Sequence, residues 1–317
     1  MSRFPFEYAK DWHVVSYSDE LARSEVKAIR YFGRDLVIFR TEGGQASVLD
    51  AYCPHLGAHL GIGGTVAGES IQCPFHHWQY GTDGRCVHVP RAHKIPAKAV
   101  VPAWPVIERN GWIAVWYHPD RKDPEFDLPA IKEWGNPAWS ERYTKFRWEI
   151  RTHPQDIMEN TADFEHFMEL HGAPQLEERI QKIDGTTLHW GLTYRLTDGP
   201  AANGRFLIEG DSWGLGCGPN YIDTGTFKVV AMAGATPIDE ERTELRLGFL
   251  IPREVKADAN LSAAAEAYMQ GHTGAIDQDV PIWENKLYRP KPVLSDVDGP
   301  IGAYRKWARQ FYAEVRQ

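Results

Sequence analysis

The sequence predicts an α+β protein in which a small all-β module comes first and an antiparallel sheet with helices against it follows. Three observations predict this fold class. The first third of the 317 residues reads as short strands between turn residues, strands return at 186–251, and helical patterns flank that second set. The length predicts about two domains, and we place them at residues 1–118 and 119–317.

The strands of the first module are recognised by short apolar segments between turn signals. Gly43-Gly44 joins the segments 36–40 and 47–52 into a hairpin. Three further segments continue this pattern, with turn signals inside the first two: 65–73, 77–89 and 111–118. Residues 119–140 are rich in proline and charge and read as a linker that its aromatic residues partly order.

The second module mixes helices and strands. Residues 156–172 read as one helix, with Asp156 as its N-cap and Gly172 just past its end. Strands separated by Gly, Pro and Asp turns follow, and two further helices are predicted at 261–288 and 301–315. We therefore expect a sheet with helices packed on it.

Composition excludes several classes of protein. Hydrophobic residues make up 43% and charged residues 25%, as in globular domains. The net charge of −8 gives no basic field for nucleic acid. No apolar run reaches the roughly 18 residues of a membrane span, and the first residues lack a secretory signal. We expect a cytoplasmic protein, whose four cysteines are metal ligands, reactive thiols or small buried residues.

The first candidate metal centre consists of two short loops that each hold one cysteine and one histidine. They are Cys53-Pro54-His55 and Cys73-Pro74-Phe75-His76. A structural zinc site is the simpler alternative, but zinc fingers group two cysteines before two histidines. Alternation of the two residue types favours a [2Fe–2S] cluster in which thiolates hold one iron and imidazoles the other.

This motif resembles the Rieske [2Fe–2S] signature. The resemblance implies that Cys53 and Cys73 bind one iron and that His55 and His76 bind the other. Replacing two thiolates by neutral histidines raises the reduction potential of the cluster, which suits a one-electron relay.

Residues around the motif refine this interpretation. Ala58 and Phe75 stand where respiratory Rieske proteins have two further cysteines, which favours the oxygenase or ferredoxin branch. His59 and His77 are expected to be neighbours of the cluster; His77 would face away along a strand, and it replaces the glycine usual there. The two remaining cysteines are expected to be small buried residues: Cys86 and Cys217.

The second candidate metal centre is the run Asn160-x-x-Asp163-x-x-His166-x4-His171. The first three residues recur at i+3 and would share one helix face. His171 is five positions after His166, so the helix must end or bulge between them for both imidazoles to reach one metal. The alternative is a capped amphipathic helix with histidines facing solvent. Two histidines with one carboxylate would form the facial triad of a non-heme Fe(II) oxygenase.

The third ligand should come from the C-terminal helix. Asp279 lies near the edge of the apolar stripe of that helix, and Asp277 lies on the other flank, so periodicity favours Asp279 only slightly. The residues that define the stripe are Met269, Ile276, Val280, Trp283 and Leu287.

The whole chain resembles the terminal oxygenase component of the Rieske non-heme iron oxygenases, and within them the sterol and ketosteroid branch of cholesterol 7-desaturases, bacterial sterol demethylases and 3-ketosteroid 9α-hydroxylases. The resemblance implies a helix-grip catalytic domain and a mononuclear Fe(II) held by His166, His171 and Asp279. The segments that carry it are 53–64, 108–118, 153–160, 278–288 and 298–312.

The resemblance also implies a working assembly. A head-to-tail homotrimer would place the cluster of one subunit beside the mononuclear iron of the next. Asp163, counted with Asn160 among the catalytic residues, would bridge the cluster ligand His76 to His166 or His171. A helix-terminal acid favoured by the dipole is the alternative for Asp163.

Electrons would come from a separate NAD(P)H-dependent reductase, with or without a ferredoxin, because no Gly-x-Gly-x-x-Gly fingerprint follows a strand here. With O2, the enzyme would hydroxylate, oxidatively demethylate or desaturate an apolar sterol-like molecule. Two alternatives stay open at this stage: an aromatic-ring or O-demethylating Rieske oxygenase, and a Rieske electron-transfer protein without catalytic activity.

Overall fold

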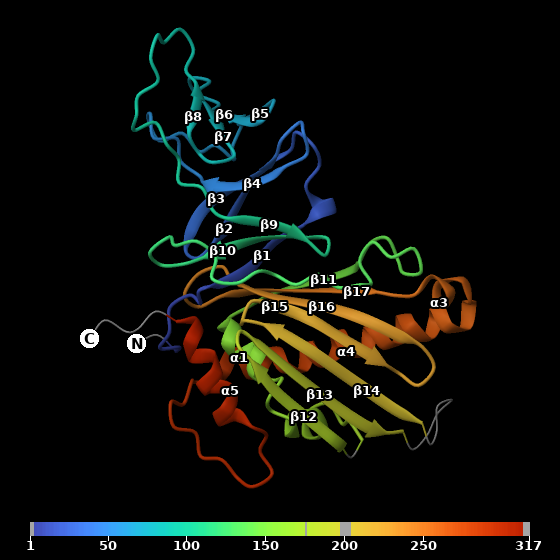
Figure 1. Cartoon of the computed structure of the whole chain (residues 1–317). Coiled ribbons are helices and arrows are strands. Elements are labelled where there is room, and N and C mark those ends of the chain that lie inside the picture. The colour runs from blue at the N-terminus through green and yellow to red at the C-terminus, as the bar shows by residue number, and fades with distance from the viewer. Residues whose placement is uncertain (1–2, 175, 197–203, 313–317) are drawn as a thin grey trace. The chain divides into compact units, whose positions relative to one another are not determined.

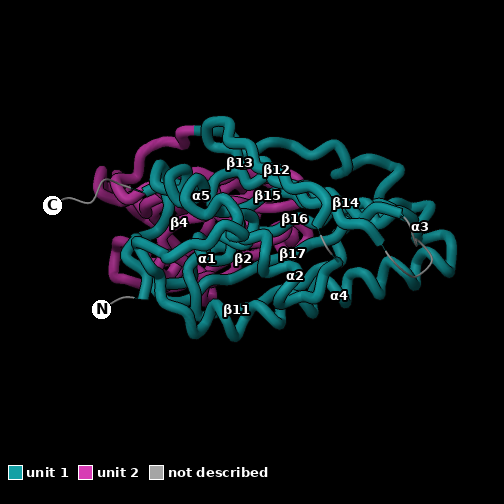
Figure 2. Tube along the Cα trace, turned by 90° about the horizontal axis from the view of Figure 1, so that it is seen from below, with its two compact units in different colours: residues 1–11, 126–317 teal, residues 12–125 magenta. Residues whose placement is uncertain are grey.

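The computed structural model describes residues 3–174, 176–196 and 204–312. The chain divides into two compact units, Trp12–Glu125 and a second unit formed by Met1–Asp11 with Phe126–Gln317 (Figure 2). The change between units at Glu125 falls within the segment that the sequence marks as a linker. The assignment of 1–118 and 119–317 as the functional domains stays a prediction.

The unit Trp12–Glu125 contains three small antiparallel sheets (Figure 1). The predicted hairpin at Gly43-Gly44 is present, and Gly44 has the positive φ of +101° that this turn requires. The strands, sheet by sheet, are β1 (Asp11–Tyr17), β10 (Trp112–Tyr117) and β9 (Val106–Arg109); β2 (Val26–Tyr31), β3 (Arg34–Arg40) and β4 (Ala46–Asp50); and β5 (Thr65–Ala67), β6 (Ser70–Gln72), β7 (Gln79–Gly81) and β8 (Cys86–His88).

The second unit is built on one seven-stranded antiparallel sheet (Figure 1). Two of its strands, β11 and β12, were not predicted from the sequence. The strand β12 is an edge strand with mostly exposed charged residues, so it lacks the apolar alternation by which strands are recognised. The strands in sheet order are β11 (Thr144–Ile150), β17 (Thr243–Leu250), β16 (Lys228–Pro237), β15 (Cys217–Asp223), β14 (Arg205–Trp213), β13 (Thr187–Arg195) and β12 (Leu176–Asp184).

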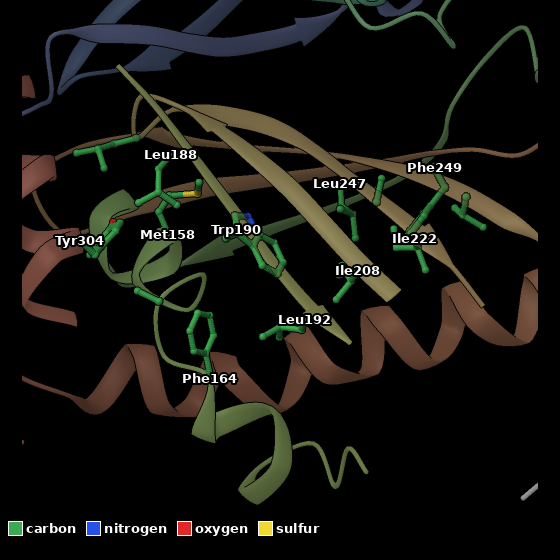
Figure 3. Packing of buried hydrophobic residues seen from close by; sticks show 14 of the residues in the cluster. Met158, Phe164, Leu188, Trp190, Leu192, Ile208, Ile222, Leu247, Phe249 and Tyr304 are labelled. Atoms are coloured by element: carbon green, nitrogen blue, oxygen red, sulfur yellow. The ribbon is translucent and has the colours of Figure 1, made fainter. Parts of the chain in front are cut away.

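The long helix α4 (Ala259–Asn285) runs along one face of this sheet (Figures 1 and 3). Its N-terminus is capped by Asp258, whose side chain accepts hydrogen bonds from the N–H groups of Asn260 and Leu261. Apolar side chains of the sheet face it, among them Trp190 and Ile208 (Figure 3). The other short helical elements are 3-10 helix η1 (Ser18–Glu20), α1 (Pro154–Glu159), α2 (Glu165–Glu169), α3 (Arg253–Ala257), α5 (Ile301–Ala308) and 3-10 helix η2 (Arg309–Phe311).

The prediction of one helix over 156–172 is wrong. The segment forms the two short helices α1 and α2 with a turn between them, because Ala162 and Phe164 turn into the core. The N-cap is His153, whose Nδ1 accepts the N–H of Gln155. Asp156 instead lies buried within α1 and pairs with the ammonium group of Lys286 at 3.2 Å.

The C-terminal helices also differ from the prediction at their ends. The helix α4 stops at Asn285, before the Pro290 and Pro292 region, so Leu287 is 57% exposed and is not part of the apolar stripe. The helix α5 ends at Ala308 and continues as a 3-10 turn to Phe311, and the predicted residues 313–315 lie outside the described residues. Among the helices of the described ranges, none has the length and apolar character needed to cross a membrane.

Candidate metal centres and substrate cavity

The two cysteine–histidine loops of the first unit share one backbone framework. In each loop the cysteine N–H donates to the carbonyl five residues further on, at 2.9 Å for Cys53 and 2.8 Å for Cys73. The carbonyl of each cysteine accepts the N–H of the fourth residue further on, Gly57 at 2.9 Å and His77 at 3.1 Å. The two loops therefore share one backbone hydrogen-bond pattern, although the histidine follows Cys53 by two residues and Cys73 by three.

This shared pattern explains why a glycine is usual at the position that His77 occupies in this chain. Gly57 has φ +78°, and His77 adopts φ +59° at the matching position. A left-handed backbone is easy for glycine and costs other residues about 1–2 kcal/mol. The prediction that His77 continues a strand is wrong, because this residue lies in the turn before β7.

The thiols and imidazoles of these loops lie at different depths. Cys53 and Cys73 are each 2% exposed, and burial raises the pKa of the Cys73 thiol. The Sγ atom of Cys53 lies 3.1 Å from the Tyr80 hydroxyl. His55 and His76 are exposed, with their ring centroids 4.7 Å apart. The thiols of Cys53 and Cys73 interact with each other, and the rings of His55 and His76 form a second pair, which suits the thiolate and imidazole sides of a two-iron cluster.

The other residues considered for this centre have structural surroundings of their own. The Nδ1 atom of His59 accepts the N–H of Gly61 at 3.0 Å. Cys86 is 9% exposed and Cys217 is fully buried, and burial raises the pKa of both thiols.

The second candidate centre lies in the other unit, where His166, His171 and Asp279 come together. One ligand atom from each residue lies within 4.8 Å of the others, and the described residues contain no other group of three such side chains. The Nε2 atom of His171 lies 3.5 Å from Oδ2 of Asp279. Two imidazoles and one carboxylate are the donor set of a non-heme Fe(II) site, so these residues fit that metal.

The local backbone explains how both histidines reach this point. The helix α2 ends at Glu169, and the N–H of His171 bonds to the carbonyl of His166 at 3.3 Å, across five residues instead of four. Gly172 follows with φ +65°. The expectation that Asn160, Asp163 and His166 share one helix face is wrong, because α1 ends before Asn160 and α2 begins after Asp163.

In both histidines of this group, the ring nitrogen Nδ1 is within hydrogen-bond distance of another group. The Nδ1 atom of His166 is hydrogen-bonded to the backbone carbonyl of Asp163, and Nδ1 of His171 lies 2.9 Å from Oε1 of Gln278. A ring that donates from Nδ1 keeps its Nε2 lone pair for a metal. Sequence reasoning missed Gln278, although its position directly before Asp279 was a usable signal.

Burial distinguishes Asp279 from Asp277. Asp279 is 7% exposed, and burial raises the pKa of its carboxyl to about 6, although His171 and a hydrogen bond from Asn160 act in the opposite direction. Asp277 is exposed and accepts a hydrogen bond from Nε1 of Trp148 at 2.8 Å. A buried carboxylate beside two imidazoles is the arrangement that a divalent cation neutralises.

A cavity of about 440 Å³ opens beside this triad, between the seven-stranded sheet and α4. Its volume is within the range of small-molecule sites. Most of its lining is apolar or aromatic, including Trp190, Ile208 and Leu247, which Figure 3 shows on the sheet face toward α4. A bulky apolar molecule in this space would lie directly against the three candidate metal ligands.

The fold and the two centres define a Rieske-type non-heme iron oxygenase. The Rieske [2Fe-2S] domain model matches residues 11–105, and the 3-Ketosteroid 9alpha-hydroxylase C-terminal domain model matches residues 115–312. The chain belongs to the family of these 3-ketosteroid 9α-hydroxylase-like Rieske oxygenases. The family resemblance predicted from the sequence is confirmed.

Similar proteins agree with this assignment. A probable 3-ketosteroid-9-alpha-monooxygenase oxygenase component from Rhodococcus rhodochrous is 30% identical, over 98% of this chain and 82% of the relative. Cholesterol 7-desaturase nvd 1 from Ciona intestinalis is 31% identical, over 98% of this chain and 70% of the relative. Dicamba monooxygenase bound to dicamba superposes with a TM-score of 0.75 at 19% identity, covering 96% of this chain and 97% of that chain, which shows the fold.

The family gives the chain its chemical class. It is an oxidoreductase whose cofactors are a Rieske [2Fe–2S] cluster and a mononuclear iron, as predicted from the sequence. As an oxygenase component it works with a separate reductase.

Proposed function

We propose that this chain is the terminal oxygenase of a system that oxidises a steroid or sterol with O2. The apolar cavity of about 440 Å³ directly beside His166, His171 and Asp279 carries this proposal, because it offers a fused-ring molecule a site next to the metal. The names of the relatives support it, since they act on 3-ketosteroids and on cholesterol.

The cofactors are held by side chains from both units. When they are bound, the cluster supplies single electrons and the mononuclear iron activates O2. The two buried thiols and two exposed imidazoles of the first unit suit the cluster, and the three convergent donors of the second unit suit the mononuclear iron. The proposed ligands are Cys53, His55, Cys73 and His76 for the cluster and His166, His171 and Asp279 for the iron.

The protein would work as a head-to-tail homotrimer in which Asp163 couples His76 of the partner subunit to the mononuclear centre. The Asp163 carboxylate is half-buried and acts electrostatically on both His166 and Asp279. Asp163→Asn should keep both metals and the trimer but nearly abolish turnover, because the amide no longer anchors both imidazoles. Glu169→Gln, an exposed acid at the end of α2, is the matched control. Full activity of the Asp163→Asn enzyme would show that Asp163 does not bridge the two centres.

A product assay tests the substrate class. The purified chain, supplied with a reductase, NAD(P)H and O2, with and without a ferredoxin, is given a 3-ketosteroid, cholesterol and a 4-methylsterol. We expect an oxidised product from at least one of the three. Turnover of an aromatic or O-methylated substrate with no reaction on any steroid would establish the alternative substrate class instead.

Iron content tests the two-centre assignment separately. The oxygenase should hold three irons per chain, whereas an electron carrier with a cluster alone would hold two. Asp279→Asn should reduce the count by one and leave the visible spectrum of the cluster unchanged, because Asp279 belongs to the mononuclear group only.

A further inference from the structure

The cavity wall on α4 carries a polar pair that neither metal centre uses. Tyr268 and His272 both line the cavity, and the Tyr268 hydroxyl lies 3.1 Å from Nδ1 of His272. The pair is one helical turn apart and is packed among aromatic rings, with the His272 ring edge-on to Phe249 at 5.4 Å and the Tyr268 ring 6.2 Å from Phe206.

The contact with Tyr268 leaves Nε2 as the ring nitrogen of His272 that can meet a ligand. Burial and the nearby His171 lower the pKa of His272 to about 4, so the imidazole is neutral near pH 7. Burial also raises the pKa of Tyr268, so its hydroxyl keeps a proton to donate to Nδ1. When Tyr268 is the donor in this contact, the proton of the neutral imidazole is on Nε2. The part of the chain that the structure describes gives this Nε2–H no hydrogen-bond acceptor.

The position of His272 relative to the metal ligands is set by helix geometry. It precedes Asp279 by seven residues on the same uninterrupted helix α4. Seven residues are about two turns, so the two side chains share a face and lie about 10 Å apart along the axis. A molecule whose oxygen is bound at His272 would extend along this face toward the metal.

The surroundings select the kind of oxygen that would bind. A neutral N–H donor in an aromatic wall suits a carbonyl or hydroxyl oxygen, whereas a carboxylate would stay buried without a positive partner. Asp211, another polar residue of the lining, is already paired with His189 at 2.9 Å. His272 is therefore placed to fix the orientation of an otherwise apolar ligand.

We propose that His272, held in one tautomer by Tyr268, is a specificity-determining residue that donates its Nε2–H to the 3-oxygen of the steroid. This inference rests on the proposed steroid substrate. Positions 7 and 9, which the relatives' names specify, both belong to the ring next to the one that bears the 3-oxygen. One anchor about two helical turns from the metal would thus serve both reactions.

Equilibrium binding to the full-length holoprotein tests the proposal without depending on turnover. Calorimetry compares a 3-ketosteroid with the same skeleton lacking the 3-oxygen. We expect His272→Phe to weaken binding of the 3-ketosteroid about tenfold, because the carbonyl loses its buried donor, and to leave the deoxy compound within about twofold. His272→Gln, which keeps an N–H donor, should restore part of the affinity. Tyr268→Phe should weaken binding of the 3-ketosteroid by a smaller factor, because it removes only the hydrogen bond that positions His272.

Two controls separate the possible failures. Ile276→Val shortens an apolar side chain that lines the cavity from the same helix face, and it should change the binding affinity of both compounds equally. If His272→Phe also weakens both compounds equally, the residue acts only through shape and the proposal is wrong. If the wild-type holoprotein binds neither compound, the proposed steroid function itself fails. An unchanged circular dichroism spectrum and an unchanged count of three irons per chain show that each variant is folded in the unit that carries the substitution.

Discussion

The ion pair between Glu159 and Arg305 allows a quantitative test of how the metal-binding unit is held together. Arg305 on α5 donates from Nε and Nη2 to the two carboxylate oxygens of Glu159 on α1, each at 2.7 Å. The two side chains are 13% and 9% exposed. Arg305 also donates to the carbonyl of Arg289 and lies over the ring of Tyr288 at 4.6 Å.

Arg305→Met should lower the free energy of unfolding by about 4 kcal/mol, because it leaves the Glu159 carboxylate buried without a positive partner. The double variant Glu159→Met with Arg305→Met should recover to within about 2 kcal/mol of wild type, since no unpaired charge is left. For a unit of this size, 4 kcal/mol corresponds to a fall in Tm of about 10 °C.

Urea unfolding followed by circular dichroism, together with iron analysis, measures both consequences. Loosening α1 should also lower occupancy of the mononuclear site, because Asn160 caps this helix and hydrogen-bonds to Asp279. The reasoning is refuted if Arg305→Met stays within 1 kcal/mol of wild type, or if the double variant is as unstable as the single one.

Three further predictions follow from the two centres. His77→Gly should raise the free energy of unfolding by about 1 kcal/mol, and Gly57→Ala should lower it by a similar amount, both read from the urea midpoint of cluster absorbance. Because the pKa of Asp279 is raised to about 6, a proton competes with the metal below that pH. The Fe(II) affinity of the metal-free site should therefore fall about tenfold from pH 7 to pH 5 through this group, as measured by Fe(II) titration at each pH. Cys86→Ala and Cys217→Ala should each keep the visible spectrum of the cluster. Loss of that spectrum in either variant would show that the substituted cysteine is a cluster ligand.

The sequence was sufficient where function depends on short-range spacing. The two cysteine–histidine loops were recognised because each loop is complete within a few residues. The hairpins at Gly43-Gly44, Gly68 and Asp83-Gly84 were recognised because glycine turns separate their strands, whereas β1, β2 and β9 were not predicted. Family resemblance then linked His166 and His171 to a carboxylate more than 100 residues away, a pairing that spacing alone could not give.

The failures have a common physical cause, which is that tertiary contacts override local pattern. The i+3 spacing of Asn160, Asp163 and His166 is helical, yet burial of Ala162 and Phe164 favours a turn between two short helices. Periodicity could hardly separate Asp277 from Asp279, and only the packing of α4 shows that Asp279 alone is buried. His272 falls on the same stripe as Met269 and Ile276, but its role appears only when Tyr268 and the cavity are seen together.

The helix α4 is the element on which these features meet. It supplies Asp279 as a proposed metal ligand, Gln278 to orient His171, and His272 as the proposed anchor for the substrate. Because one continuous helix carries all three, the distance from the anchor to the ligand Asp279 does not depend on any loop. With one end of the steroid fixed, the carbon that is attacked depends on how the ring skeleton is tilted. That tilt is set by the opposite wall of the cavity, where side chains of the sheet such as Trp190 and Leu247 face α4.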